Sequence, residues 1–111
     1  MDIAEEHVAN ITIVEVKGPL NSNTAKKLGD RLSSLIEEGR TRLIIDLEHV
    51  SYISSVGLRV LMVADQLVEK ANGKLALCKL SAETQALFEL ADFADLFEIC
   101  SSREQGLIKL S

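Results

Sequence analysis

The chain has 111 residues, which is the size of one ordinary domain and enough to bury a core without disulfides or metals. Its 12 basic and 17 acidic residues give a net charge of -5, which argues against nucleic acid and anionic lipid surfaces as partners because both are negatively charged. The acidic N-terminus and the lack of an apolar run of about 20 residues predict a cytoplasmic protein without a signal peptide or direct membrane insertion.

Two short β-strands are predicted at the start of the chain. Positions 11–17 are rich in β-branched residues, and the Gly18-Pro19 pair that follows cannot easily continue a strand. A shorter strand near Ile3 to His7 is expected to pair with it as a hairpin through Ala9-Asn10. The chain is therefore expected to open with an antiparallel pair of strands.

The next segment has the spacing of an amphipathic helix that starts at Asn23 or Thr24. Its apolar residues recur three, four and seven positions apart, with charged residues between them, and Gly39 follows the last turn. The apolar positions are Ala25, Leu28, Leu32, Leu35 and Ile36. The glycine is the expected end of this helix.

Residues 43–47 are almost continuously apolar, which is typical of a short central strand covered on both faces. Asp46 is the exception, close to the carboxyl end of that strand. Its carboxylate either accepts hydrogen bonds from nearby amides or forms a surface contact.

A second amphipathic helix is predicted to begin near Val56 and to end at Asn72-Gly73. Apolar residues occupy a wide face of this helix, so we expect it to be the most buried helix of the chain. They are Leu58, Val60, Leu61, Met62, Val63, Leu67, Val68 and Ala71.

The last third of the chain continues the alternation of strand and helix. A strand at 74–79 precedes a helix capped by Ser81, and a further strand at 96–100 precedes a helical tail at 101–110. The third helix carries Ala86, Leu87 and Leu90, with Phe88 available for packing, and the tail is expected to dock on the sheet through Leu107, Ile108 and Leu110.

Cys78 and Cys100 lie in apolar, strand-like segments, and neither has a second Cys or His at metal-ligand spacing. We interpret both as buried structural thiols. The alternation as a whole predicts an α/β protein, with residues 1–111 forming a single domain around a mixed, mostly parallel sheet with helices packed on it.

Ser54 and Ser55 precede the second helix, in a loop beyond the carboxyl end of a strand, where ligands and partners usually bind. Serine is also a preferred N-cap, so either residue could simply close the free amides at the helix start. A serine hydrolase would need a base and an orienting carboxylate, often with a Gly-x-Ser-x-Gly elbow, and this elbow is missing here. His7 and His49 fit surface positions better than a catalytic role. We predict no catalytic residue, no cofactor and no metal site.

A longer pattern surrounds these serines. An apolar strand ends in Asp46-Leu47, a link carrying Val50 and Tyr52 follows, and the sequence Ser54-Ser55-Val56-Gly57-Leu58 opens the next helix. Two further segments belong to the pattern, Gly18-Pro19-Leu20-Asn21 before the first helix and Gly73-Lys74-Leu75 at a helix-to-strand junction. Nearly the whole chain thus resembles STAS domains, in particular bacterial anti-sigma factor antagonists, which implies a STAS-like fold.

The resemblance implies a partner-switching cycle. In that family the antagonist binds an anti-sigma factor that is also a serine kinase, phosphorylation of the antagonist ends the binding, and a PP2C-type phosphatase reverses the modification. The modified serine lies two positions before the glycine, which corresponds to Ser55, with Ser54 as the alternative. The residues expected to contact the partner are Asn21, Ser22, Ser54, Ser55, Val56, Gly57 and Leu58.

Two residues depart from the family pattern. Ser54 stands where an acid is common, and Asn21 stands where an aspartate is common, so two carboxylates near the switch are missing. Binding is expected to persist, because both side chains retain hydrogen-bonding groups, while recognition by a kinase differs. STAS domains also serve as accessory subunits of membrane transport complexes, where they dock on an ATPase without a serine cycle, and this is the alternative function.

Overall fold

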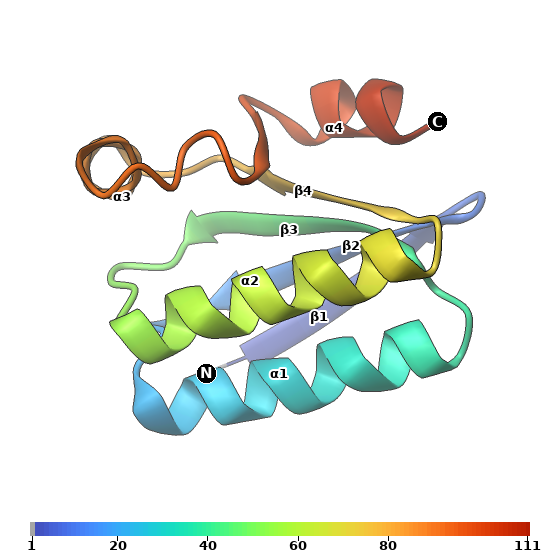
Figure 1. The fold of residues 1–111 in the computed structure, drawn as a ribbon, viewed down its shortest axis with the longest axis horizontal. Helices are drawn as coiled ribbons and strands as arrows, with labels where there is room; N and C mark the ends of the chain where they lie inside the picture. Colours follow the sequence, from blue (N-terminus) through green and yellow to red (C-terminus); the bar gives the residue numbers. More distant parts are fainter. Residues whose placement is uncertain (1) are drawn as a thin grey trace.

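The computed structural model describes residues 2–111, which form a five-stranded sheet and four helices (Figure 1). The elements are β1 Asp2–Val8, β2 Ile11–Lys17, α1 Ser22–Glu37, β3 Arg42–His49, α2 Ser55–Lys70, β4 Lys74–Cys78, α3 Ala82–Leu90, β5 Glu98–Cys100 and α4 Arg103–Leu110. The predicted alternation of strands and helices is confirmed. The largest boundary differences are in β3, which is longer than expected at both ends, and β5, which is shorter.

The sheet is mixed and mostly parallel, as the sequence predicted. Its strands follow the order β1-β2-β3-β4-β5, with β1 antiparallel to β2 and every later pair parallel. The hairpin between β1 and β2 turns at Ala9, which has a left-handed φ of 55°. Because β2 and β3 lead directly into α1 and α2, the carboxyl ends of these central strands lie next to two helix N-termini.

Helices cover both faces of the sheet (Figure 1). α1 and α2 lie side by side on one face, and α4 lies on the other. In β3, Leu43 and Ile45 belong to the core beneath α1 and α2, whereas Ile44 packs with Leu110 of α4. All four side chains have no exposed surface, which confirms the prediction of a central strand covered on both faces.

The prediction that the second helix is the most buried one is wrong, because α1 and α2 have the same length and four buried residues each. α2 packs through Leu61, Ala64 and Val68, but Val63 is 45% exposed and Leu67 is 37% exposed. α2 contacts both the sheet and α1, and Val63 and Leu67 lie at the edge of its contact with α1, where they stay partly open to solvent. The wide apolar face of this helix therefore leaves an uncovered surface.

The two C-terminal helices bury only part of the apolar residues assigned to them. In the short α3 the buried residues are Thr84 and Phe88, whereas Leu87 and Leu90 are exposed. In α4 Leu110 is buried but Ile108 is 75% exposed, because residues two positions apart lie on different sides of a helix. Docking of the tail on the sheet is confirmed for Leu110 and for the partly buried Leu107, and it is wrong for Ile108.

Cys78 and Cys100 are neighbours across β4 and β5, and both are buried free thiols, as predicted. Burial raises the pKa of the Cys78 thiol from an ordinary 9.0 to about 12, and the Asp46 carboxylate adds to the rise. Because the folded state holds this proton more tightly than the unfolded state, the resulting stability is fully present below about pH 9 and is lost between about pH 9 and pH 12.

Alkaline pH should therefore cost the wild-type protein more stability than it costs a Cys78→Val variant. The expected excess is about 1 kcal/mol in the free energy of unfolding between roughly pH 7 and pH 10. Urea unfolding at the two pH values measures it. An equal loss of unfolding free energy in both proteins would show that ionisation of this thiol does not cause the loss of stability at alkaline pH.

Candidate functional site

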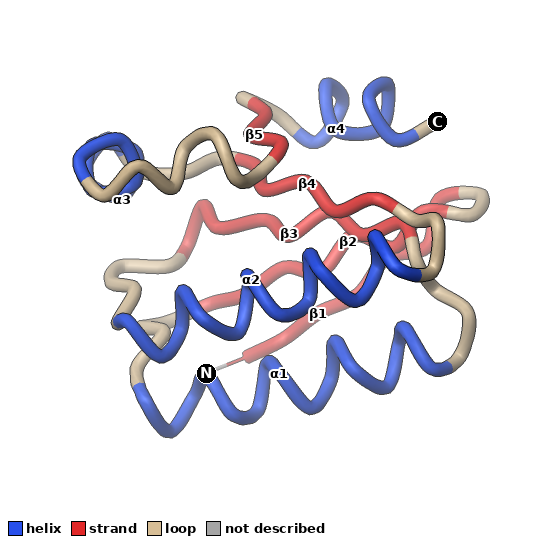
Figure 2. Tube along the Cα trace, in the orientation of Figure 1, coloured by secondary structure: helices blue, strands red, loops and turns tan. Residues whose placement is uncertain are grey.

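The loops after β2 and β3 carry two helix N-termini to the same end of the molecule (Figure 2). The Leu20 amide donates to the Tyr52 carbonyl at 2.7 Å, and the Ser54 amide donates to the Leu20 carbonyl at 2.9 Å. Leu20 and Ile53 form a parallel bridge, so the pairing of β2 with β3 extends into the loops. This short ladder places the two cap residues, Asn21 of α1 and Ser54 of α2, close together.

Asn21 caps α1. Its side-chain oxygen accepts hydrogen bonds from the backbone amides of Asn23 and Thr24, both at 3.0 Å, and the Thr24 hydroxyl accepts from the Asn21 amide at 2.9 Å. This reciprocal capping box satisfies the free amides of the first turn. α1 therefore begins at Ser22, one or two residues before the predicted start, because Asn21 supplies the cap.

The two serines before α2 have different roles. Ser54 is the N-cap, since its hydroxyl oxygen accepts from the Gly57 amide at 3.1 Å. Ser55 is the first residue of the helix, is exposed, and makes no side-chain hydrogen bond within residues 2–111. The Ser55 hydroxyl is therefore free to react or to contact a partner, whereas that of Ser54 is engaged in holding the helix.

Gly57 allows α2 to approach the loop before α1. A Cβ at this position would lie 2.8 Å from Cγ of Leu20 and 2.9 Å from its carbonyl oxygen, closer than carbon atoms pack. The glycine thus fixes the first turn of α2 against the loop that carries Asn21. Nearby, Val56 is 43% exposed and Tyr52 is 57% exposed, so the rim of this end of the molecule is partly apolar.

The predicted site residues fall into two groups. Those that build the site through caps and packing are Asn21, Ser54, Gly57 and the half-buried Leu58. Those that present an exposed side chain are Ser22, Ser55 and Val56. We name the exposed surface around Ser22, Ser55 and Val56 the docking surface, since it is the candidate site of partner binding.

Tyr52 and Arg59 are exposed residues of this surface that sequence reasoning missed as contact candidates. Arg59 lies four residues after Ser55 on α2, so the two side chains are neighbours one helical turn apart. This spacing of four residues could have been recognised in the sequence. The first turns of α1 and α2 contain no acidic residue, so the positive ends of both helix dipoles face this surface without a carboxylate on it.

Asp46 also proves to be a structural acceptor, one of the two interpretations left open by the sequence. Its side chain is fully buried and accepts from the Glu48 amide at 3.0 Å. The partner that the sequence did not reveal is Arg103 at the start of α4, whose Nε donates to Asp46 at 2.6 Å. The contact holds α4 to the strand that leads into the docking surface.

The different roles of the two serines predict different stabilities of their alanine variants. Ser54→Ala removes the cap of α2 and should lower the free energy of unfolding by about 1 kcal/mol. Ser55→Ala removes an exposed, unbonded hydroxyl and should change it by less than about 0.5 kcal/mol. Urea unfolding of both variants at neutral pH measures the difference, and equal losses would contradict the assignment of Ser54 as the sole cap.

The described part of the chain contains no cluster of three or more His, Cys, Asp or Glu side chains suited to hold a metal ion. Among residues 2–111 no helix has both the length and the apolar character needed to cross a membrane. What the described residues offer at this end of the molecule is the exposed, unbonded hydroxyl of Ser55 at the start of α2.

Comparison with known proteins shows the family of this chain. The family model of the STAS domain matches residues 2–106. A protein of Bordetella bronchiseptica described as a candidate anti-sigma factor antagonist, BtrV, is 31% identical over 104 residues, which cover 94% of this chain and 90% of that protein.

Two solved proteins share the fold. The crystal structure of TM1081 from Thermotoga maritima, a candidate anti-sigma factor antagonist, has a TM-score of 0.92 at 16% identity and covers 97% of this chain and 93% of that chain. The structure of the Bacillus anti-sigma factor antagonist SpoIIAA has been solved in its unphosphorylated and its phosphorylated form. Its phosphorylated form has a TM-score of 0.76 at 17% identity and covers 99% of this chain and 100% of that chain. These similarities confirm the predicted architecture.

Proposed function

This chain belongs to the STAS domain family, and we propose that it is an anti-sigma factor antagonist that binds a kinase-type anti-sigma factor and is switched off by phosphorylation of Ser55. The observation that carries the proposal is the free Ser55 hydroxyl, exposed in the first turn of α2 beside a serine already used as the cap. A residue at this place is reachable by a kinase without unfolding the helix.

The position suits a switch that changes binding without changing the fold. A phosphoserine adds about -1.5 to -2 charges, and the positive end of the α2 dipole stabilises negative charge in the first turn. The folded state is therefore expected to tolerate the modification. A partner packed on Val56 and Tyr52 would instead meet added bulk and a strongly hydrated charge at its contact surface.

Reversal of the switch requires hydrolysis of the phosphate ester. We assign this step to a PP2C-type phosphatase, and the exposure of Ser55 supports access by such an enzyme as well as by the kinase. In this cycle Ser55 is a substrate of other proteins and the chain itself performs no catalysis.

One observation favours a second candidate function. The turn before α2 lacks an acid, because Ser54 occupies the cap, and Asn21 caps α1 in place of an aspartate. A STAS accessory subunit of a membrane transport ATPase complex would need the docking surface but no phosphorylation, so missing carboxylates would not impair it.

Binding measurements with both kinds of partner separate the two candidates. Isothermal titration of the purified chain with the kinase-type anti-sigma factor of the same genome should give saturable binding, and titration with a transporter ATPase domain should give none. The opposite pattern would favour the accessory-subunit function. Absence of binding to the anti-sigma factor would refute the proposed antagonist role.

A further inference from the structure

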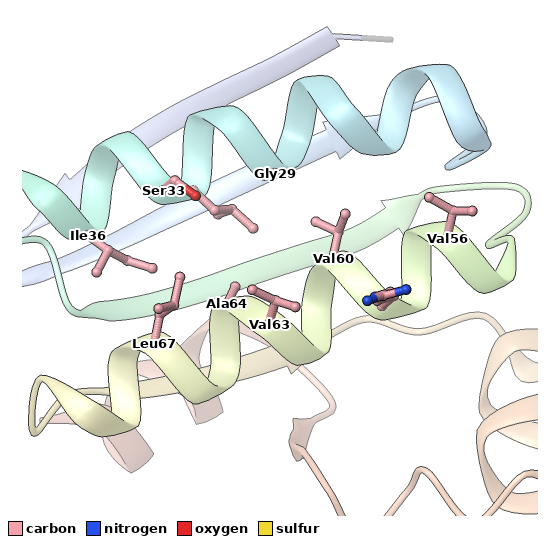
Figure 3. A pocket seen from close by; sticks show the side chains of 10 residues that line it. Gly29, Ser33, Ile36, Val56, Val60, Val63, Ala64 and Leu67 are labelled. Carbon is pink, nitrogen blue, oxygen red and sulfur yellow. The ribbon is translucent and has the colours of Figure 1, made fainter.

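A groove of about 220 Å³ runs between α1 and α2 on the face of the molecule away from the sheet (Figure 3). Along α2 its wall is the stripe Val56, Val60, Val63 and Leu67, spaced four, three and four residues apart. At a rise of about 1.5 Å per residue this stripe is about 16 Å long. Three of its four side chains are more than a third exposed, so the apolar surface is open to a partner.

Gly29 forms part of the opposite wall, in the middle of α1. Glycine is among the least favourable residues in a helix interior. Packing does not require it here, because a Cβ would meet only the methyl groups of Val60 at 3.5 Å, an ordinary contact distance. Ser33, one turn further along, is also small. These small residues widen the groove, and Gly29 lowers the stability of α1. A bound partner in the groove would explain why the chain has a glycine here.

Arg59 is the one charged residue among those that line the groove. Its side chain is exposed and has no ion pair or hydrogen bond within residues 2–111. The chain has a net charge of -5, yet this cation beside the apolar groove has no partner among the described residues. It therefore favours binding of a segment that carries a carboxylate.

The groove is continuous with the docking surface. Val56 belongs to its wall and directly follows Ser55, and Arg59 lies one helical turn beyond Ser55 on α2. Residues four apart on a helix can pair, so a phosphate on Ser55 would compete for the guanidinium of Arg59.

We propose that the groove between α1 and α2 receives an amphipathic helix of the anti-sigma factor, and that a carboxylate on this helix pairs with Arg59. The inference rests on the proposed function and names the partner segment that it requires. A stripe about three turns long, with three of its four side chains more than a third exposed, fits helix-in-groove binding with apolar anchors at successive turns. Phosphorylated Ser55 would then weaken binding partly by taking Arg59 from the partner's carboxylate.

The test is the dissociation constant of the full chain for the kinase-type anti-sigma factor, measured by isothermal titration for a matched set of variants. Arg59→Glu and Val63→Glu should each weaken binding at least about tenfold, and Arg59→Lys by less than about threefold. The control is Leu90→Glu, an apolar-to-acid change at a residue of α3 that is 84% exposed and outside the groove, which should leave affinity unchanged. Circular dichroism and heteronuclear NMR spectra verify that every variant is folded.

The outcomes separate this inference from the proposed function. If the wild type binds and Ser55→Asp weakens binding, but both groove variants match the Leu90→Glu control, the groove inference is overturned and the antagonist function stands. If the wild type does not bind, both are overturned. Two further outcomes would overturn the inference if the groove variants leave partner affinity unaffected. NMR shifts of groove residues on addition of decanoate would assign the groove to an aliphatic acid. Self-association in sedimentation would assign it to a second copy of the chain.

Discussion

Ser55→Asp is expected to weaken binding to the kinase-type anti-sigma factor by about a hundredfold, which corresponds to about 3 kcal/mol. The residue is exposed at the start of α2, so a carboxylate there is compatible with the fold and should leave the free energy of unfolding nearly unchanged. At the interface the same carboxylate must be desolvated against the partner, and it competes with the partner for the neighbouring Arg59. Isothermal titration measures the loss.

Ser55→Asn is the matched control for that result, because it has nearly the size and shape of aspartate without the charge. Its affinity should remain within about fivefold of the wild type. Equal losses for Asn and Asp would attribute the effect to bulk rather than to charge. An aspartate variant that binds as tightly as the wild type would remove the basis for a phosphorylation switch.

Arg103→Met is expected to lower the free energy of unfolding by about 3 kcal/mol, the largest loss of stability predicted for an exchange outside the docking surface. Arg103 joins α4 to the sheet, with its Nε at 2.6 Å from Asp46 and an Nη at 2.8 Å from Glu15. The hydrogen bond to Asp46 raises the pKa of the Arg103 guanidinium above its ordinary value. Among residues 2–111, its removal leaves the fully buried carboxylate of Asp46 with only the ammonium of Lys79, at 4.0 Å, as a cationic neighbour.

The double variant Asp46→Asn with Arg103→Met separates the unpaired charge from lost packing. Asparagine keeps an acceptor for the Glu48 amide but has no charge to bury, so most of the loss in Arg103→Met should be recovered. Urea unfolding of both single variants and the double variant completes the cycle. A loss below about 1 kcal/mol in Arg103→Met would contradict a structural role for the pair.

Much of the fold could be predicted because local patterns determine it. The β-branched run before Gly18-Pro19 and the glycine stop at Gly39 are each explained by the residues next to them. The hairpin through Ala9 and the central position of β3 followed from the same kind of pattern. These features depend on neighbours in sequence, and all were confirmed.

The errors arose where a distant segment decides the outcome. The apolar period of α2 shows that the helix has a wide apolar face, but not that α1, with Gly29 opposite, leaves Val63 and Leu67 uncovered. In the same way, Asp46 was recognised as unusual in its strand, yet its partner Arg103 lies 57 residues further along the chain. Such pairings depend on how the elements pack, which periodicity does not specify.

The candidate site was found from its sequence pattern, but the pattern could not distinguish the roles of adjacent residues. Both Ser54 and Ser55 were possible helix caps. The structure separates them because only the hydroxyl of Ser54 accepts from the Gly57 amide. Asn21 was expected to contact a partner, and the structure adds that its side chain caps α1. Of the two serines, Ser55 is therefore the one whose hydroxyl is unengaged and available for phosphorylation.

The most direct test of this claim is mass spectrometry of the chain after incubation with the kinase-type anti-sigma factor and ATP. We expect one phosphate, on Ser55, that is absent from the Ser55→Ala variant and is removed by a PP2C-type phosphatase. Phosphate on Ser54, or no phosphate on a chain that still binds the anti-sigma factor, would contradict it.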